Sequence, residues 1–249
     1  MRIRRALACL LSLAILAPAA VLAQDAVPEG AVLQADARPA LGLMGTIPIY
    51  WGEPESLEAL LSTEHRAHWA RARIERGHDL VPIDYLTPES LAPVRRLLLA
   101  QPRGLAPEEN VALDDWVRGG GHLLLFVDPM MTGESRFAIG DRRRPQDVAL
   151  LSPILAHWGL DLRFDGEAVE GLEMREIAGR QVPVNLPGHF GSTAQGGDCS
   201  LESAGLLAVC SVGAGRAVIL ADGALMDLAG PWPNAQDSLD MLLERAFPN

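Results

Sequence analysis

Short apolar runs and amphipathic segments alternate through the first half of the chain. Each short apolar run predicts a buried strand, and each segment with apolar residues three or four apart predicts a helix. Strands are expected at 41–47, 79–83, 96–100 and 122–127, and helices at 57–76, 89–94 and 107–118. Short apolar strands that alternate with helices are typical of a parallel sheet covered on both faces. The expected fold class is therefore α/β.

The second half of the chain has a weaker pattern that ends in a hairpin and a helix. A helix at 148–158 and a strand at 160–164 come first. Residues 165–198 are rich in Gly, Pro and polar side chains, which predicts a loop-rich insertion of short β pieces and loops. Two apolar runs, 206–212 and 216–221, flank Gly213-Ala214-Gly215, which predicts a β-hairpin. A last helix is expected at about 235–247.

The first 23 residues have the features of a secretory signal peptide. Arg2, Arg4 and Arg5 precede an apolar segment at 6–17, and Val21-Leu22-Ala23 is a cleavage motif of small residues. A spanning helix needs roughly 20 apolar residues, and a proline interrupts this run at position 18. A periplasmic protein without a stable membrane anchor is expected; a retained signal anchor is the alternative. Residues 24–40 are then a flexible leader, and 41–249 a single α/β domain.

The charge and the cysteines refine this picture. The net charge is −11, and loss of the three signal arginines takes it to −14. Because an acidic protein repels phosphate backbones, no nucleic-acid partner is expected. Cys199 and Cys210 form an even pair after Cys9 is removed with the signal. An oxidising compartment favours a disulfide between them, worth at most about 3 kcal/mol; two free buried thiols are the alternative.

The sequence has few motifs that could serve catalysis or cofactor binding. Gly119-Gly120-Gly121 lies between a helix and a strand, the reverse of a phosphate-binding loop, so we interpret it as a helix end. His65 and His68 lie three apart on one predicted helix, but no further ligand set with a tight spacing accompanies them. No cysteine or serine sits on a strand-to-helix elbow. We therefore predict no catalytic residue, no metal and no cofactor.

Ligand binding is predicted at the carboxyl ends of the strands, where pockets of parallel α/β sheets lie. The residues expected to converge there are Tyr50, Trp51, Glu53, Asp128 and Asp222. Aromatic planes beside carboxylates suit a sugar or another polar organic ligand. In the alternative interpretation the aspartates cap turns and the aromatic rings pack.

One block of the sequence resembles a known family. The stretch RLLLAQPRGLAPEENVALDDWVRGGGHLLLFVDP, at 96–129, is similar to the uncharacterised ABC-type transport auxiliary domain. That family is related to the gliding-motility auxiliary protein and to the N-terminal domain of an intraflagellar-transport protein. The likeness continues through GDRRRPQDVALLSPILAHWGLDL at 140–162 and GAGRAVILADG at 213–223, and it covers most of residues 41–247.

The resemblance implies a flavodoxin-like sandwich similar to class I glutamine amidotransferases, with a C-terminal β-hairpin and helix. In those enzymes the strand that matches 122–127 leads into a cysteine elbow, whereas this chain has Asp128-Pro129-Met130 there. The implied function is a non-catalytic domain that binds a ligand or a protein partner, accessory to an ABC-type system. The alternative is a periplasmic hydrolase that uses Asp128, Asp222 and Glu53, which requires carboxylates roughly 5–9.5 Å apart.

Overall fold

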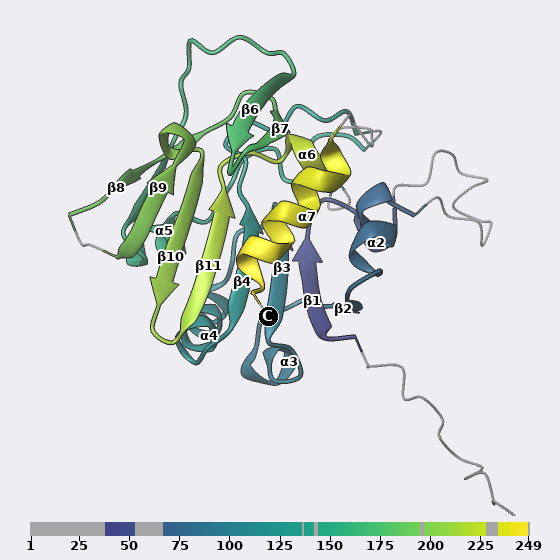
Figure 1. Ribbon diagram of the computed structural model, residues 1–249, viewed down its shortest axis with the longest axis vertical. Coiled ribbons are helices and arrows are strands. Elements are labelled where there is room, and N and C mark those ends of the chain that lie inside the picture. The colour runs from purple at the N-terminus through teal and green to yellow at the C-terminus, as the bar shows by residue number, and fades with distance from the viewer. Residues whose placement is uncertain are drawn as a thin grey trace, which may run out of the picture. The chain divides into compact units, whose positions relative to one another are not determined.

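The central sheet has seven strands, in the order β2-β1-β3-β4-β11-β10-β9 (Figure 1). The computed structural model describes residues 38–52, 67–135, 137–141, 144–194, 197–227 and 234–248. From one edge of the sheet to the other, the strands are β2 (Asp79–Pro82), β1 (Ala40–Gly45), β3 (Arg96–Ala100), β4 (His122–Phe126), β11 (Gly215–Leu220), β10 (Leu207–Val212) and β9 (Asp198–Glu202). Neighbours from β2 to β11 are parallel, and β10 and β9 are antiparallel. The predicted α/β class with a mostly parallel sheet is confirmed.

Helices lie on both faces of this sheet. The helices are α2 (Trp69–Ile74), α3 (Pro88–Leu91), α4 (Pro107–Arg118), α5 (Ser152–His157), α6 (Ala224–Asp227) and α7 (Ala235–Ala246), with a 3-10 turn η1 at Ser203–Gly205. Helix α7 crosses one face, where it contacts β4, β11 and α2, and α4 lies on the other face with α3 and α5 (Figure 1). Within the described residues, none of the helices has the length and apolar character needed to cross a bilayer.

Strands β3 and β4 form the centre of the core because their side chains are buried on both faces. Leu97 to Ala100 and Leu123 to Phe126 are each completely buried. Such runs are typical of a parallel sheet between two helical layers. Gly45 lets β1 approach β3 closely, since a Cβ at this position would lie 2.0 Å from the carbonyl oxygen of Ala100.

The segment expected to be a loop-rich insertion contains three strands. Strands β6 (Glu173–Ile177) and β7 (Arg180–Val184) form an antiparallel hairpin, and β8 (His189–Ser192) pairs with β5 (Leu160–Arg163). The predicted hairpin of β10 and β11 is confirmed, but β9 extends it to three antiparallel strands. The helix predicted at 148–158 is shorter, and of the one predicted at 57–76 only α2 lies within the described residues.

Candidate functional site

A cavity of about 720 Å³ lies at the carboxyl ends of β1, β2 and β3. From β1 the chain continues to β2, its neighbour on one side, and from β3 it continues to β4, its neighbour in the opposite direction along the sheet. The order of strands therefore reverses between β1 and β3. Ligands of open α/β sheets bind in the crevice at such a reversal. The cavity is lined by Met44 and Gly45 of β1 and by Thr46 directly after it. Ile83 and Asp84, which follow β2, and Arg103 in the loop after β3 complete this side.

Thr46 and Gln101 hold the loop that closes the cavity on one side. The Thr46 hydroxyl donates to the carbonyl of Gln101 (2.6 Å) and accepts from the amide of Gln146 (2.8 Å). The buried Gln101 side chain donates to the carbonyls of Gln146 and Asp128, both at 2.9 Å, and accepts from the Asp128 amide at 2.8 Å. Both residues follow directly on buried strands, and the sequence interpretation missed them although their strands were predicted.

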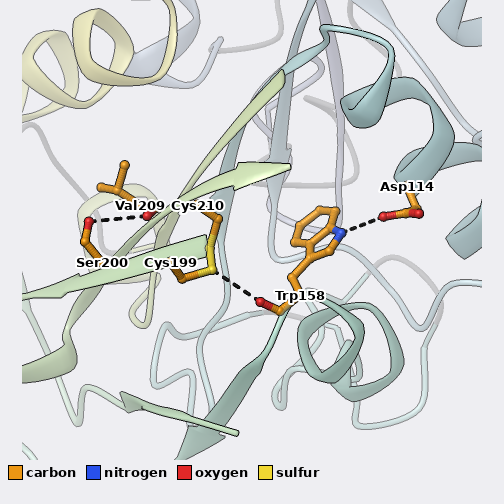
Figure 2. The surroundings of a disulfide bond; sticks show 6 residues. All are labelled: Asp114, Trp158, Cys199, Ser200, Val209 and Cys210. Atoms are coloured by element: carbon orange, nitrogen blue, oxygen red, sulfur yellow. Dashed lines mark hydrogen bonds between the residues drawn. A yellow bond between two sulfur atoms is a disulfide. The ribbon is translucent and has the colours of Figure 1, made fainter. Parts of the chain in front are cut away.

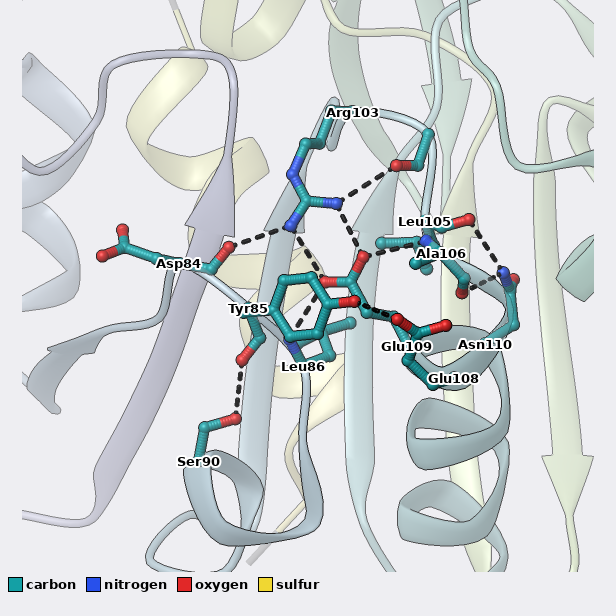
Figure 3. Close-up of polar contacts among 11 residues, drawn as sticks. Asp84, Tyr85, Leu86, Ser90, Arg103, Leu105, Ala106, Glu108, Glu109 and Asn110 are labelled. Atoms are coloured by element: carbon teal, nitrogen blue, oxygen red, sulfur yellow. Dashed lines mark hydrogen bonds and ion pairs between the residues drawn. The ribbon is translucent and has the colours of Figure 1, made fainter.

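Arg103 is fixed in the cavity wall by the fully buried Glu109 (Figure 3). The guanidinium donates from Nη1 to Oε2 at 2.7 Å and from Nη2 to Oε1 at 2.9 Å, a bidentate pair. The carboxylate also accepts from the amides of Leu86 (3.1 Å) and Ala106 (2.9 Å). Burial alone would raise the pKa of Glu109, but the four donors outweigh it and the pKa is lowered. The Arg103 charge is therefore compensated inside the protein.

The remaining charges of the cavity leave an acidic surplus. Arg144 pairs with Asp147 across 2.9 Å, so these two side chains neutralise one another. The exposed carboxylate of Asp84 has no hydrogen bond or ion pair in the part of the chain that the structure describes; only its backbone carbonyl is used, by Arg103. Because basic groups are compensated and Asp84 is not, the cavity suits a neutral polar or a cationic ligand better than an anion.

Trp51 presents an aromatic surface at the cavity. Its side chain lines the cavity and is 70% exposed. Tyr50 supports it edge-on, with ring centroids 4.8 Å apart, and the guanidinium carbon of Arg71 lies 4.2 Å from the centroid of the Tyr50 ring. Of the predicted ligand-binding residues, Trp51 thus lines the cavity and Tyr50 packs behind it, whereas Glu53 lies outside the described residues.

Asp128 and Asp222 lie together at the ends of β4 and β11, but they are closed off from the cavity. They are 2% and 0% exposed, and neither lines it. Asp128 accepts from the amides of Met130 and Gly223, each at 2.8 Å. Asp222 accepts from the amides of Ala224 (2.8 Å) and Asn185 (3.0 Å). Both therefore cap turns, the alternative that the sequence left open.

Burial also changes the protonation of these two aspartates. It raises the pKa of Asp128 to about 7, and the nearby Asp227 adds to this rise against the backbone donors. Burial followed by the charge of Asp128 raises the pKa of Asp222 well above its usual range. Two adjacent buried carboxylates cannot both ionise readily, so the pair holds a proton at neutral pH.

The predicted disulfide is confirmed (Figure 2). Cys199 of β9 lies directly opposite Cys210 of β10, with Cα atoms 4.0 Å apart. The Cys199 sulfur contacts the carbonyl oxygen of Trp158 at 3.3 Å, and the Trp158 indole donates to Asp114 at 2.8 Å. The bridge fastens the edge strand β9 at the far side of the sheet from the cavity.

His68 is a structural residue in this fold. Its Nδ1 accepts from the amide of Ala70 (3.2 Å) at the start of α2, and its Nε2 donates to the carbonyl of Met226 (2.7 Å). Both ring nitrogens are therefore engaged, and His65 lies outside the described residues. Among the residues that the structure covers, no group of three or more His, Cys, Asp or Glu side chains is placed to hold a metal ion.

Comparison with known proteins gives similarity to solved structures alone. No family model and no curated protein matches the chain. An exo-β-1,4-mannosidase from Opitutaceae bacterium strain TAV5 is similar at 14% identity and a TM-score of 0.48, over 85% of this chain and 36% of that one. A β-galactosidase from Rahnella sp. R3 is similar at 9% identity and a TM-score of 0.46, over 84% and 31%.

A cytoplasmic protein from Salmonella typhimurium LT2 is similar at 10% identity and a TM-score of 0.48, over 84% of this chain and 99% of that one. The chain thus spans about a third of the length of the two glycosidases and nearly the whole of the Salmonella protein. At these identities and TM-scores, the activities of these proteins carry no argument for this chain.

Proposed function

We propose that this chain is an exported, non-catalytic α/β domain that binds a polar organic ligand at the carboxyl ends of β1, β2 and β3, as an accessory to an ABC-type transport system. The observation that carries ligand binding is the cavity of about 720 Å³ with Trp51 exposed along it and the Asp84 carboxylate unpaired within the described residues. An aromatic plane beside a carboxylate suits a carbohydrate or an organic cation. The transport role rests on the sequence resemblance.

A flavodoxin-like sandwich of the amidotransferase type is part of the proposal. The five parallel strands follow the order β2-β1-β3-β4-β11, and the flavodoxin-like order is 2-1-3-4-5. Asp128 stands at the position of the amidotransferase nucleophile, and its carboxylate is used by the amides of Met130 and Gly223. This engagement supports a domain that keeps the scaffold without the reaction.

The hydrolase alternative has weaker support. It requires Asp128 and Asp222 to reach a substrate, and both are buried beneath the turns that they cap. A raised pKa is common among catalytic acids, but buried structural pairs have it too. No observation favours the hydrolase over the binding domain.

Ligand binding is testable by tryptophan fluorescence of the purified chain, titrated with cellobiose, maltose and choline. We expect saturable binding of at least one of these probes. Trp51→Ala should abolish it, and Asp84→Asn should weaken it. Asp198→Asn is the matched control, because it removes an exposed carboxylate on β9, far from the cavity. No saturable binding, or equal behaviour of the Asp84 and Asp198 variants, would refute the proposed site.

Export and the transport role need separate measurements. The disulfide supports an oxidising compartment. Cell fractionation with mass spectrometry should find a periplasmic protein that begins at Gln24. Affinity capture from envelope extracts should recover a permease or another ABC subunit; recovery of none would overturn the accessory role without touching ligand binding.

A further inference from the structure

A second cavity, of about 430 Å³, lies at the opposite edge of the sheet, where β2 and β3 begin. The end of α2, the turn that follows it, the first residue of β3 and the C-terminal part of α7 enclose it. One wall is apolar and consists of Ile74, Leu243 and Phe247. The other wall carries arginines. A cavity with one apolar and one basic wall differs from the cavity at the carboxyl ends, where the surplus charge is acidic.

The arginines of the basic wall exceed the acidic residues that line the cavity by one charge. Arg73 forms a two-bond pair with Asp240, with Nε and Oδ1 2.8 Å apart, and is neutralised. Arg76 and Arg96 both line the cavity, and no carboxylate of the described residues pairs with either of them. Glu244 is the remaining acid of the lining. Two unpaired arginines against one glutamate leave a net charge of about +1, in a chain whose net charge is −11.

Arg96 is held in place before any ligand arrives. Its Nη1 donates to Nε2 of His78 at 3.0 Å, and its guanidinium carbon lies 6.0 Å from the centroid of the Phe247 ring. The His78 ring packs edge-on against the same phenyl ring, with centroids 5.9 Å apart. Burial and then the charge of Arg96 lower the pKa of His78, so the imidazole is neutral at pH 7 and accepts this bond. The other N–H groups of the Arg96 guanidinium have no acceptor among the described residues and can bind a ligand.

We propose that this cavity binds a small organic monoanion, a carboxylate on a short apolar body, with the carboxylate on Arg96 and Arg76 and the body against Ile74, Leu243 and Phe247. Guanidinium groups bind carboxylates with charge-assisted hydrogen bonds. The surplus of one positive charge matches a monoanion. A simple inorganic ion would leave the apolar wall without contacts, so the ligand is expected to have an apolar part. This site is independent of the proposed ligand cavity because the two lie at opposite edges of the sheet.

Isothermal titration calorimetry with hexanoate, hexanamide and inorganic phosphate tests the proposal on the purified chain. We expect saturable binding of hexanoate in the millimolar range, and no binding of hexanamide, which keeps the apolar body without the charge. Arg96→Gln and Arg76→Gln should each weaken hexanoate binding about tenfold, which corresponds to about 1.4 kcal/mol. Arg180→Gln is the matched control, since it removes an exposed arginine at the first position of β7, outside the cavity.

The exposed Arg76 keeps the test decisive if the Arg96 variant fails to fold. Three results would overturn the proposal: no saturable hexanoate binding, equal weakening in the Arg180 control, or phosphate binding as tight as hexanoate. The last result would show that the apolar wall takes no part. A loss of sugar or choline binding at the other cavity would leave these outcomes unchanged.

Discussion

Replacement of Glu109 by glutamine tests whether the wall of the ligand cavity depends on a buried ion pair. The Glu109 carboxylate is fully buried and accepts from four donors: two N–H groups of the Arg103 guanidinium and the amides of Leu86 and Ala106. Glutamine has the same shape, but its NH₂ group would face two of these donors. Arg103 would lose its compensating charge at the same time.

The expected cost follows from these contacts. A hydrogen bond to a charged group contributes about 1.5–3 kcal/mol, and a donor left without its acceptor costs about 1–3 kcal/mol. The Arg103 side chain is 39% exposed, so water replaces part of what it loses and its share is discounted. We expect Glu109→Gln to lower the free energy of unfolding by about 3 kcal/mol, which is a fall in Tm of about 6–12 °C for a domain of this size.

Urea unfolding at several pH values provides the assay. The folded pKa of Glu109 is lowered, so its contribution is present above the unfolded pKa of about 4.3 and is lost as the pH falls through the folded value. Wild type should therefore lose this contribution in acid, and Glu109→Gln should not. Glu108→Gln is the control, because Glu108 is exposed and its carboxylate accepts from the Tyr85 hydroxyl (2.6 Å) at the surface. A loss below about 1 kcal/mol in Glu109→Gln, which is typical of ordinary substitutions, would refute the reasoning.

Three further predictions follow from the same structure. Stability should fall as the pH rises through about 7, because burial raises the folded pKa of Asp128 to that value. The stabilisation by protonated Asp128 is fully present below the unfolded pKa of about 3.9 and is lost as the pH rises through the folded pKa. The urea midpoint of Asp128→Asn should change less over this pH range than that of the wild type. The double variant Cys199→Ser/Cys210→Ser should lose up to about 3 kcal/mol in urea unfolding, whereas reactive thiols in the non-reduced wild type would contradict the bridge. Gly45→Ala should lower the free energy of unfolding by about 3 kcal/mol or more, since its Cβ would meet the Ala100 oxygen at 2.0 Å. The control Gly104→Ala, whose nearest contact is the Leu150 Cβ at 3.5 Å, should unfold at nearly the wild-type Tm.

The central strands and the long helices were predictable because their signals are local. Strands β3 and β4 are continuous apolar runs, and α4 begins at a proline followed by two glutamates. Strand β9 was not predicted, and β6 was expected only as one of the short β pieces within 165–198, because both strands are polar and neither is fully buried. β9 is a strand because β10 pairs with it and a disulfide joins the two, and β6 because β7 pairs with it. Such pairings depend on tertiary contacts that no local pattern records.

The candidate site, too, was predictable only in part from the sequence. The rule that ligands bind at the carboxyl ends of parallel strands pointed to the side of the sheet where Trp51 lines a cavity. It did not find Arg103, because the side chain owes its place to the buried Glu109 six residues later on a helix. Nor did it separate a carboxylate that lines the cavity, Asp84, from those that cap turns, Asp128 and Asp222, since all three follow strands.

Gln101 explains why the cavity lies beside β1 and β3 and not at the end of β4. Its side chain spans the ends of β3 and β4 and bonds both the amide and the carbonyl of Asp128. The Asp128 carboxylate then takes the amide of Gly223 after β11, so the ends of three neighbouring strands are joined by hydrogen bonds. The cavity of about 720 Å³ lies on the other side of Gln101, where Thr46 and Arg103 line it. The end of β4 is thus filled by the protein's own backbone contacts, and we expect ligand binding to depend on the β1–β3 side of the sheet.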